Sequence, residues 1–215
     1  MSIYDLHTHH HPDEAGTAIV QLTPSHFAPR PQHYYSVGLH PWTITDHWRV
    51  QMAQLYVMAQ HPQVLLIGEA GIDKRRASAP LALQIDVMRE HIHLSELVGK
   101  PLLIHCVKGV DELLALRKEQ PITQPWILHG YRGGVEQWRQ LTRAGIMVSL
   151  GERYDEALIQ EIPLDLLLLE SDESPSVTTT YAQVSASTAV SEQALRETVS
   201  HNIHRLLTYV KPSPF

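Results

Sequence analysis

Eight short apolar segments recur along the 215-residue chain, and most are separated by longer stretches with helical spacing. The segments occupy residues 3–8, 17–22, 34–39, 64–69, 101–106, 125–129, 145–149 and 166–170. Short, β-branched runs that alternate with helices favour a parallel sheet. Eight such strands are the number that closes a barrel. We therefore predict an α/β fold, a TIM-like (β/α)8 barrel, with residues 1–215 forming a single domain.

Helical periodicity predicts the elements between these strands. Apolar residues recur at helical intervals over 44–60, 80–98, 109–119, 133–144 and 191–208. Roughly ten residues separate the first two strands, too few for a helix that returns along the barrel. We expect an irregular barrel whose first helix is reduced or missing. The polar stretch 173–190 carries no clear assignment.

The composition narrows the classes of function. The formal net charge of −6 excludes a global basic field that would recruit nucleic acid, so any such contact needs a local site. The single cysteine, Cys106, excludes an internal disulfide framework. No apolar run has transmembrane length and the N-terminus shows no signal-peptide pattern, so we expect a cytoplasmic location and no membrane partner. Nothing in the sequence indicates an obligate protein partner.

Metal-ligand side chains stand at the ends of the predicted strands. In order they are His7, His9, His40, Glu69, His105, His129 and Asp172. Barrel active sites lie at the carboxyl ends of the strands, so these side chains should meet at one rim. Four imidazoles and two carboxylates could bind two divalent ions with Glu69 as the bridge. Mixed ligation of this kind suits Zn, Mn or Fe and tolerates Mg less well.

Several motifs in collinear order carry a family resemblance. They are DLHTH (5–9), SVGLHPW (36–42), LIGEAGID (66–73), LLIHC (102–106), ILHGYRGG (127–134), LLLESD (167–172) and HNIHRLL (201–207). With these motifs the chain resembles the TatD family of metal-dependent hydrolases. That family is DNase-like, with a TIM barrel similar to that of the amidohydrolases, and this chain would be a short variant of it. Lys74, where the family commonly has an aromatic residue, and Ser171, where it usually has Thr, depart from the pattern.

The resemblance implies a role for each matching residue. His7 and His9 would hold one metal, His105 and His129 the second, and Glu69 would bridge the two. Asp172 would bind metal and orient or deprotonate the attacking water. The expected catalytic set is Asp172, Glu69 and Glu170, and the expected substrate contacts are His40, Asp73 and Arg132. Asp5 lies deeper than the histidine pair and is expected to orient a ligand rather than to be one.

These observations predict a divalent-metal-dependent phosphodiester hydrolase that uses a two-metal-activated water. Its expected activity is that of a DNase resembling a 3′–5′ exonuclease, with two Zn, Mn or Mg ions. Its partners would be DNA or oligonucleotide ends, or a small phosphoester. The alternatives are a PHP-like phosphomonoesterase, another amidohydrolase-class hydrolase acting on a small molecule, and a zinc-stabilised scaffold. Structural zinc prefers four closed, mostly thiolate ligands, which this ligand set does not match.

Overall fold

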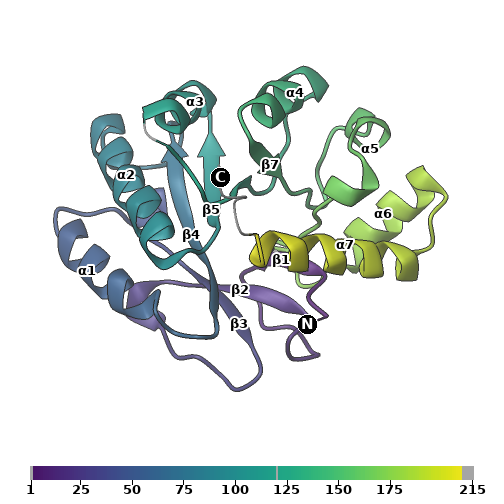
Figure 1. The fold of residues 1–215 in the computed structure, drawn as a ribbon, viewed down its shortest axis with the longest axis horizontal. Helices are drawn as coiled ribbons and strands as arrows, with labels where there is room; N and C mark the ends of the chain where they lie inside the picture. Colours follow the sequence, from purple (N-terminus) through teal and green to yellow (C-terminus); the bar gives the residue numbers. More distant parts are fainter. Residues whose placement is uncertain (1, 120, 210–215) are drawn as a thin grey trace, which may run out of the picture.

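The strands form one parallel sheet in which each strand neighbours the next along the chain. The computed structural model describes residues 2–119 and 121–209. The strands are β1 (Asp5–Thr8), β2 (Ala18–Leu22), β3 (Tyr34–Val37), β4 (Val64–Asp73), β5 (Leu102–Val107), β6 (Trp126–Leu128) and β7 (Ile146–Val148). Figure 1 shows the sheet curling so that the helices lie outside it. The predicted TIM-like α/β fold is confirmed.

The helices follow the strands much as the periodicity predicts. They are α1 (Trp48–Met58), α2 (Leu81–Val98), α3 (Val110–Glu119), α4 (Val135–Arg143), α5 (Ala157–Glu161), α6 (Thr178–Thr188) and α7 (Glu192–Leu207), with 3-10 turns η1 (Pro24–His26), η2 (Pro41–Thr43) and η3 (Leu164–Leu166). No helix lies between β1 and β2, and only η1 lies between β2 and β3, as expected from the short first crossover. None of the described helices is long and apolar enough to cross a bilayer.

The predicted eighth strand differs from a regular strand. Residues 167–172 lie between β7 and β1, but they pair through isolated bridges, Leu150 with Leu169 and Thr8 with Asp172. Leu6 N–H donates to Leu169 O, and Asp172 N–H donates to His7 O, both at 3.0 Å. This segment, the closing segment, therefore joins the two ends of the sheet through five backbone hydrogen bonds, three on the β1 side and two to Leu150, without forming a continuous ladder.

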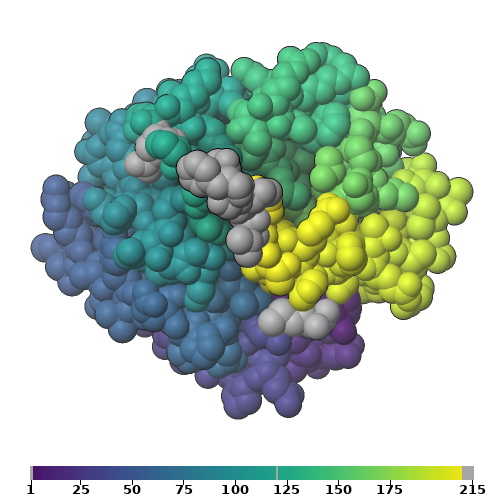
Figure 2. Space-filling view, viewed as in Figure 1, coloured from purple at the N-terminus to yellow at the C-terminus, as the bar shows by residue number. Residues whose placement is uncertain are grey.

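Most of the polar stretch that the sequence left unassigned forms a helix, which packs on Tyr4, the residue before β1. α6 begins at Thr178 and buries Tyr181, whose hydroxyl donates to Tyr4 O at 2.7 Å. The Arg196 guanidinium of α7 lies over the rings of Tyr4 and Tyr181, 4.6 Å from each centroid. Figure 2 accordingly shows the last helix, in yellow, next to the purple N-terminal segment. Tertiary contacts of this kind stabilise α6, whose sequence shows no clear helical periodicity.

Glycine in β4 allows β5 to approach closely. Gly71 has φ +153° and pairs with His105 of β5. A Cβ built on Gly71 would lie 1.9 Å from the His105 carbonyl oxygen. β4 is buried along almost its whole length, so a displaced strand has no free space to occupy. Gly71 therefore sets how closely His105 lies to the β4 side chains.

Gly71→Ala should lower the free energy of unfolding by about 3 kcal/mol or more, because it adds a backbone clash to an unfavourable φ. The matched control is Gly99→Ala, which has φ +66° but no atom within 4 Å of the added Cβ. It should cost about 1 kcal/mol. Urea unfolding of the two variants measures the difference. Equal losses would show that the close β4–β5 approach contributes nothing.

Candidate metal centre

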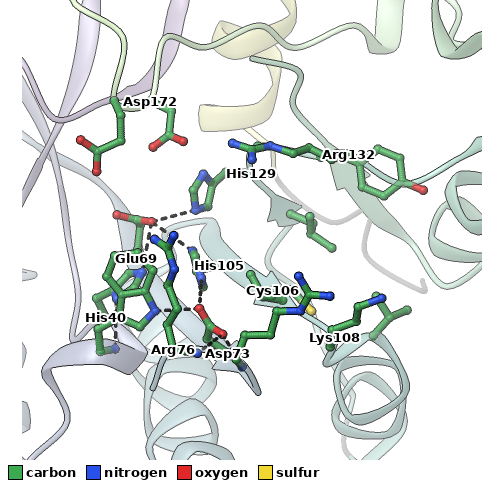
Figure 3. Close-up of a pocket in the computed structure, with 18 of the residues that line it drawn as sticks. His40, Glu69, Asp73, Arg76, His105, Cys106, Lys108, His129, Arg132 and Asp172 are labelled. Carbon is green, nitrogen blue, oxygen red and sulfur yellow. Dashed lines mark hydrogen bonds and ion pairs between the residues drawn. The ribbon is translucent and has the colours of Figure 1, made fainter. Parts of the chain in front are cut away.

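The carboxylate of Glu69, near the middle of β4, lies at the centre of the site. It is buried, and five histidines lie around it. The nearest nitrogens are His129 Nε2 at 2.7 Å, His9 Nε2 at 3.2 Å, His7 Nε2 at 3.6 Å, and His40 Nε2 and His105 Nδ1 at 3.8 Å. They come from β1 and the residue just after it, the segment after β3, β5, and the segment after β6. Figure 3 shows Glu69 with His40, His105 and His129 facing one pocket.

The two oxygens of Glu69 face different sets of imidazoles. Oε2 is the oxygen near His7 and His9. Oε1 is the oxygen near the other three histidines, His40, His105 and His129. A carboxylate whose oxygens face separate ligand sets has the arrangement needed to bridge two cations.

Asp172 completes the first of these sets. Its Oδ1 lies 3.6 Å from His7 Nε2 and 3.7 Å from His9 Nε2. Its φ of +54° is in the left-handed region, which Asp tolerates better than most residues. The closing segment thus brings Asp172 beside β1. All six expected ligands, His7, His9, Glu69, His105, His129 and Asp172, lie together in the structure.

The nitrogen atoms of the site fit divalent cations. Both ring nitrogens of His7 and Nε2 of His129 are buried without a hydrogen-bond partner in the described structure. His129 Nε2 lies 2.7 Å from Glu69 Oε1, yet this contact lacks hydrogen-bond geometry. Buried polar atoms without partners are costly, and a bound cation would satisfy imidazole lone pairs and carboxylate oxygens together. His and carboxylate donors are ordinary ligands of Zn and Mn.

Electrostatics favour a charged carboxylate at the centre. Burial alone raises the pKa of Glu69, but the neighbouring His129 and His7 outweigh it and hold that pKa well below its usual range. For Asp172 burial likewise raises the pKa, and His7 and His129 lower it further than burial raises it. Both groups therefore remain carboxylates at neutral pH and can act as ligands.

Asp73 holds His105 in place at the wall of the pocket, which it helps to line. It is buried, and its Oδ2 lies 3.2 Å from His105 Nε2 and accepts from Trp42 Nε1 at 2.7 Å. Its Oδ1 accepts from the backbone N–H groups of Arg75 and Arg76. Burial raises the pKa of Asp73, but these hydrogen bonds lower it to about 2. This positioning contact leaves His105 Nδ1 free to face Glu69, and the substrate contact expected of Asp73 stays a prediction.

Glu170 contacts His129 in the way that Asp73 contacts His105. It is fully buried, its Oε1 lies 3.3 Å from His129 Nδ1, and its Oε2 accepts from the Ser149 hydroxyl. Both oxygens are occupied by these contacts, which position His129, and the catalytic role expected of Glu170 stays a prediction. A proton on His129 Nδ1 leaves Nε2 with its lone pair toward Glu69. Sequence reasoning did not identify Ser149, which follows β7 without any distinguishing motif.

Two departures from the family pattern have structural explanations. Ser171 donates its backbone N–H and hydroxyl to the two oxygens of buried Asp5, at 3.0 and 2.7 Å. Asp5 thereby positions the residue next to Asp172, in the supporting role predicted for it. Lys74 forms an ion pair with Glu112 of α3 and so is not available to the substrate.

His40 presents a proton donor to the site. Its Nδ1 accepts from the Trp42 backbone N–H at 3.1 Å, so the proton of the neutral ring lies on Nε2, facing Glu69. Burial lowers the pKa of His40 to about 4, although Glu69 opposes this effect. A neutral ring with an Nε2–H group is suited to donate to a substrate oxygen.

Cationic side chains surround the pocket above the cluster. The pocket has a volume of about 1070 Å³, and Arg75, Arg76, Lys108 and Arg132 line it. Within residues 2–119 and 121–209 no carboxylate lies within ion-pair distance of these four side chains. Figure 3 shows Arg132 extending toward His129 and Asp172. The sequence predicted a substrate contact for Arg132, but Arg75 and Arg76 were not among the predicted contacts.

The curled parallel sheet and the imidazole–carboxylate cluster are together typical of barrel-fold, metal-dependent hydrolases. A family model described as TatD related DNase matches residues 23–208, and the chain belongs to this family.

Several curated relatives match part of the chain. An uncharacterized metal-dependent hydrolase of Bacillus subtilis, YabD, is 27% identical over 147 residues, which are 65% of this chain and 58% of that protein. A 3′-5′ ssDNA/RNA exonuclease TatD of Cronobacter turicensis is 29% identical over 152 residues, 64% of this chain and 56% of that protein. The matches thus span less than two thirds of these relatives.

A solved structure supports the fold over a greater length. The crystal structure of the TatD homologue YjjV of Escherichia coli superposes with a TM-score of 0.82 at 19% identity. The superposition covers 98% of this chain and 100% of that chain. At this identity the likeness concerns the barrel alone.

Divalent cations should raise the melting temperature of chelator-treated protein, because binding to the folded state alone stabilises it. At a metal concentration a hundredfold above Kd the increase should be about 5–10 °C. Glu69→Gln should remove most of this increase, while the exposed control Glu156→Gln should keep it. Calorimetry with Mn or Zn provides the measurement. An unchanged melting temperature in the wild type would contradict the metal centre.

Asp73→Asn and Glu170→Gln should each weaken metal affinity by about 10- to 100-fold, because the histidine that each positions loses its orienting carboxylate. Calorimetric titration measures the affinity, and circular dichroism checks that the fold persists. Unchanged affinity in a folded variant would remove that carboxylate from the centre.

Proposed function

We propose that the chain is a divalent-metal-dependent phosphodiesterase that removes nucleotides from DNA or oligonucleotide ends in the 3′–5′ direction. The observation that carries this proposal is the Glu69 carboxylate, whose two oxygens face separate imidazole sets at the floor of a cation-lined pocket. His7, His9, Glu69 and Asp172 would hold one ion, and Glu69, His105 and His129 the other. Such ions lower the pKa of bound water and neutralise charge on a phosphoryl group.

Asp172 is the group that would accept the proton of the attacking water. Its side chain is 23% exposed, against 3% for Glu69, so it is the more open carboxylate of the cluster. Its lowered pKa keeps it in the basic form at neutral pH. Its position at the end of the closing segment places it beside both the ligands and the pocket.

The side chains of the pocket walls carry positive charge and a hydrogen-bond donor, which suit an anionic substrate. Arg132 and Arg76 can pair with phosphate oxygens because the described structure gives them no carboxylate partner. The His40 Nε2–H group can donate to an oxygen on the Glu69 side of the cluster. These local cations compensate for the net charge of −6, which does not by itself attract nucleic acid.

Action at the ends of DNA strands suits a pocket of this kind, whose walls come from the segments after β3, β4, β5 and β6 and from Asp172 at the end of the closing segment. The name of the relative in Cronobacter turicensis, a 3′-5′ ssDNA/RNA exonuclease, agrees with this mode. A phosphomonoesterase or a small-molecule amidohydrolase would share the metal centre, so substrate tests must separate them.

Chelator-treated protein should regain activity with Mn, Mg or Zn and cleave labelled single-stranded DNA and bis-p-nitrophenyl phosphate more efficiently than p-nitrophenyl phosphate. Asp172→Asn should lower kcat/KM for the diesters by about 100- to 10,000-fold, as expected for a lost proton acceptor. Glu156→Gln serves as the matched exposed control. Turnover of the monoester alone would indicate the phosphomonoesterase instead, and no turnover of any phosphoester would overturn the proposal.

A further inference from the structure

An aromatic side chain in the pocket wall has no role in the mechanism above. Trp42 lies in η2, directly after His40, and its side chain lines the pocket. It is 43% exposed, although large aromatic side chains are usually well covered. Its exposed surface therefore faces the space that a substrate would enter.

Trp42 is held rigidly in this position. Its indole N–H donates to buried Asp73 at 2.7 Å, and Asp73 in turn contacts His105. The Trp42 ring stands edge-on to His40 at 4.6 Å and to His105 at 5.7 Å between centroids. An immobilised ring pays little conformational entropy when a ligand packs against it.

A cation accompanies the ring. The Arg76 guanidinium lies 5.2 Å from the Trp42 ring centroid, a cation–π arrangement. Within the described part of the chain no carboxylate pairs with this guanidinium. Figure 3 shows Arg76 on the same side of the pocket as Asp73 and His40. An aromatic surface beside an unpaired arginine is the combination with which proteins bind a base and its phosphate in single strands.

We propose that Trp42 is a stacking platform for the nucleobase next to the reacting phosphate, and that Arg76 pairs with the phosphate attached to that nucleotide. This inference rests on the proposed function and adds a specificity-determining contact to it. The ring lies beside His40 and His105, the two histidines that lie between it and Glu69 Oε1. Stacking tolerates any base, so Trp42 selects nucleotides over phosphoesters without a base and does not select a sequence.

The test compares kcat/KM for a single-stranded oligonucleotide with kcat/KM for the same strand carrying an abasic residue on one or the other side of the scissile phosphate. The wild type should prefer the complete strand to one abasic strand by about 5- to 150-fold, the range expected for one stacked base. Trp42→Ala should reduce this ratio to near one. Trp42→Phe, which keeps a ring, should retain much of it.

The ratio of kcat/KM for the complete strand to kcat/KM for the abasic strand separates a loss of stacking from damage to the metal centre. Trp42→Ala also removes the N–H donor of Asp73, and that loss lowers cleavage of complete and abasic strands alike. Tyr209→Ala, which alters an aromatic residue of similar exposure outside the pocket, should leave the ratio unchanged. A wild type that cleaves both strands equally, or a Trp42→Ala variant that keeps the preference, would overturn the stacking role alone. A wild type that cleaves neither strand would overturn the proposed function and this inference together.

Discussion

One buried carboxylate governs the arrangement of the whole strand-end rim. Glu69 lies within 4 Å of imidazole nitrogens from five histidines, in a part of β4 that is buried on both faces. A buried charge is tolerated only where opposite charges or hydrogen bonds compensate for it. β1, β5 and the segments after β3 and β6 each direct at least one histidine toward this group. The close β4–β5 approach at Gly71 also helps to compensate for the buried charge of Glu69, because it brings His105 close to that carboxylate.

That the expected ligands would lie together was predictable, because parallel strands end at one edge and residues far apart in sequence must meet there. His105 and His129 needed only a correct assignment of their strands. The missing first helix was predictable for an equally simple reason, since the connection between β1 and β2 is too short to return along the barrel. Both predictions depend on chain geometry and not on side-chain detail.

Asp73 and Glu170 show where such reasoning stops. Both are carboxylates near strand ends, just as Asp172 is, and nothing local distinguishes their roles. The distinction comes from partners on other elements: Trp42 occupies Asp73 from 31 residues away, and Ser149 occupies Glu170 from 21 residues away. α6 was missed for a related reason, because packing of Tyr181 against Tyr4 stabilises a stretch whose polar composition hides its periodicity.

The hydrogen bonds that close the barrel also hold Asp172, one of the expected ligands. The closing segment is fastened to β1 through the Thr8 bridge and through the contacts of Asp5 with Ser171. The segment is buried from Leu167 to Ser171, and its backbone hydrogen bonds reach both ends of the sheet. Closure of the barrel and assembly of the cluster are therefore one event, because Asp172 meets His7 and His9 only where the two ends of the sheet are joined.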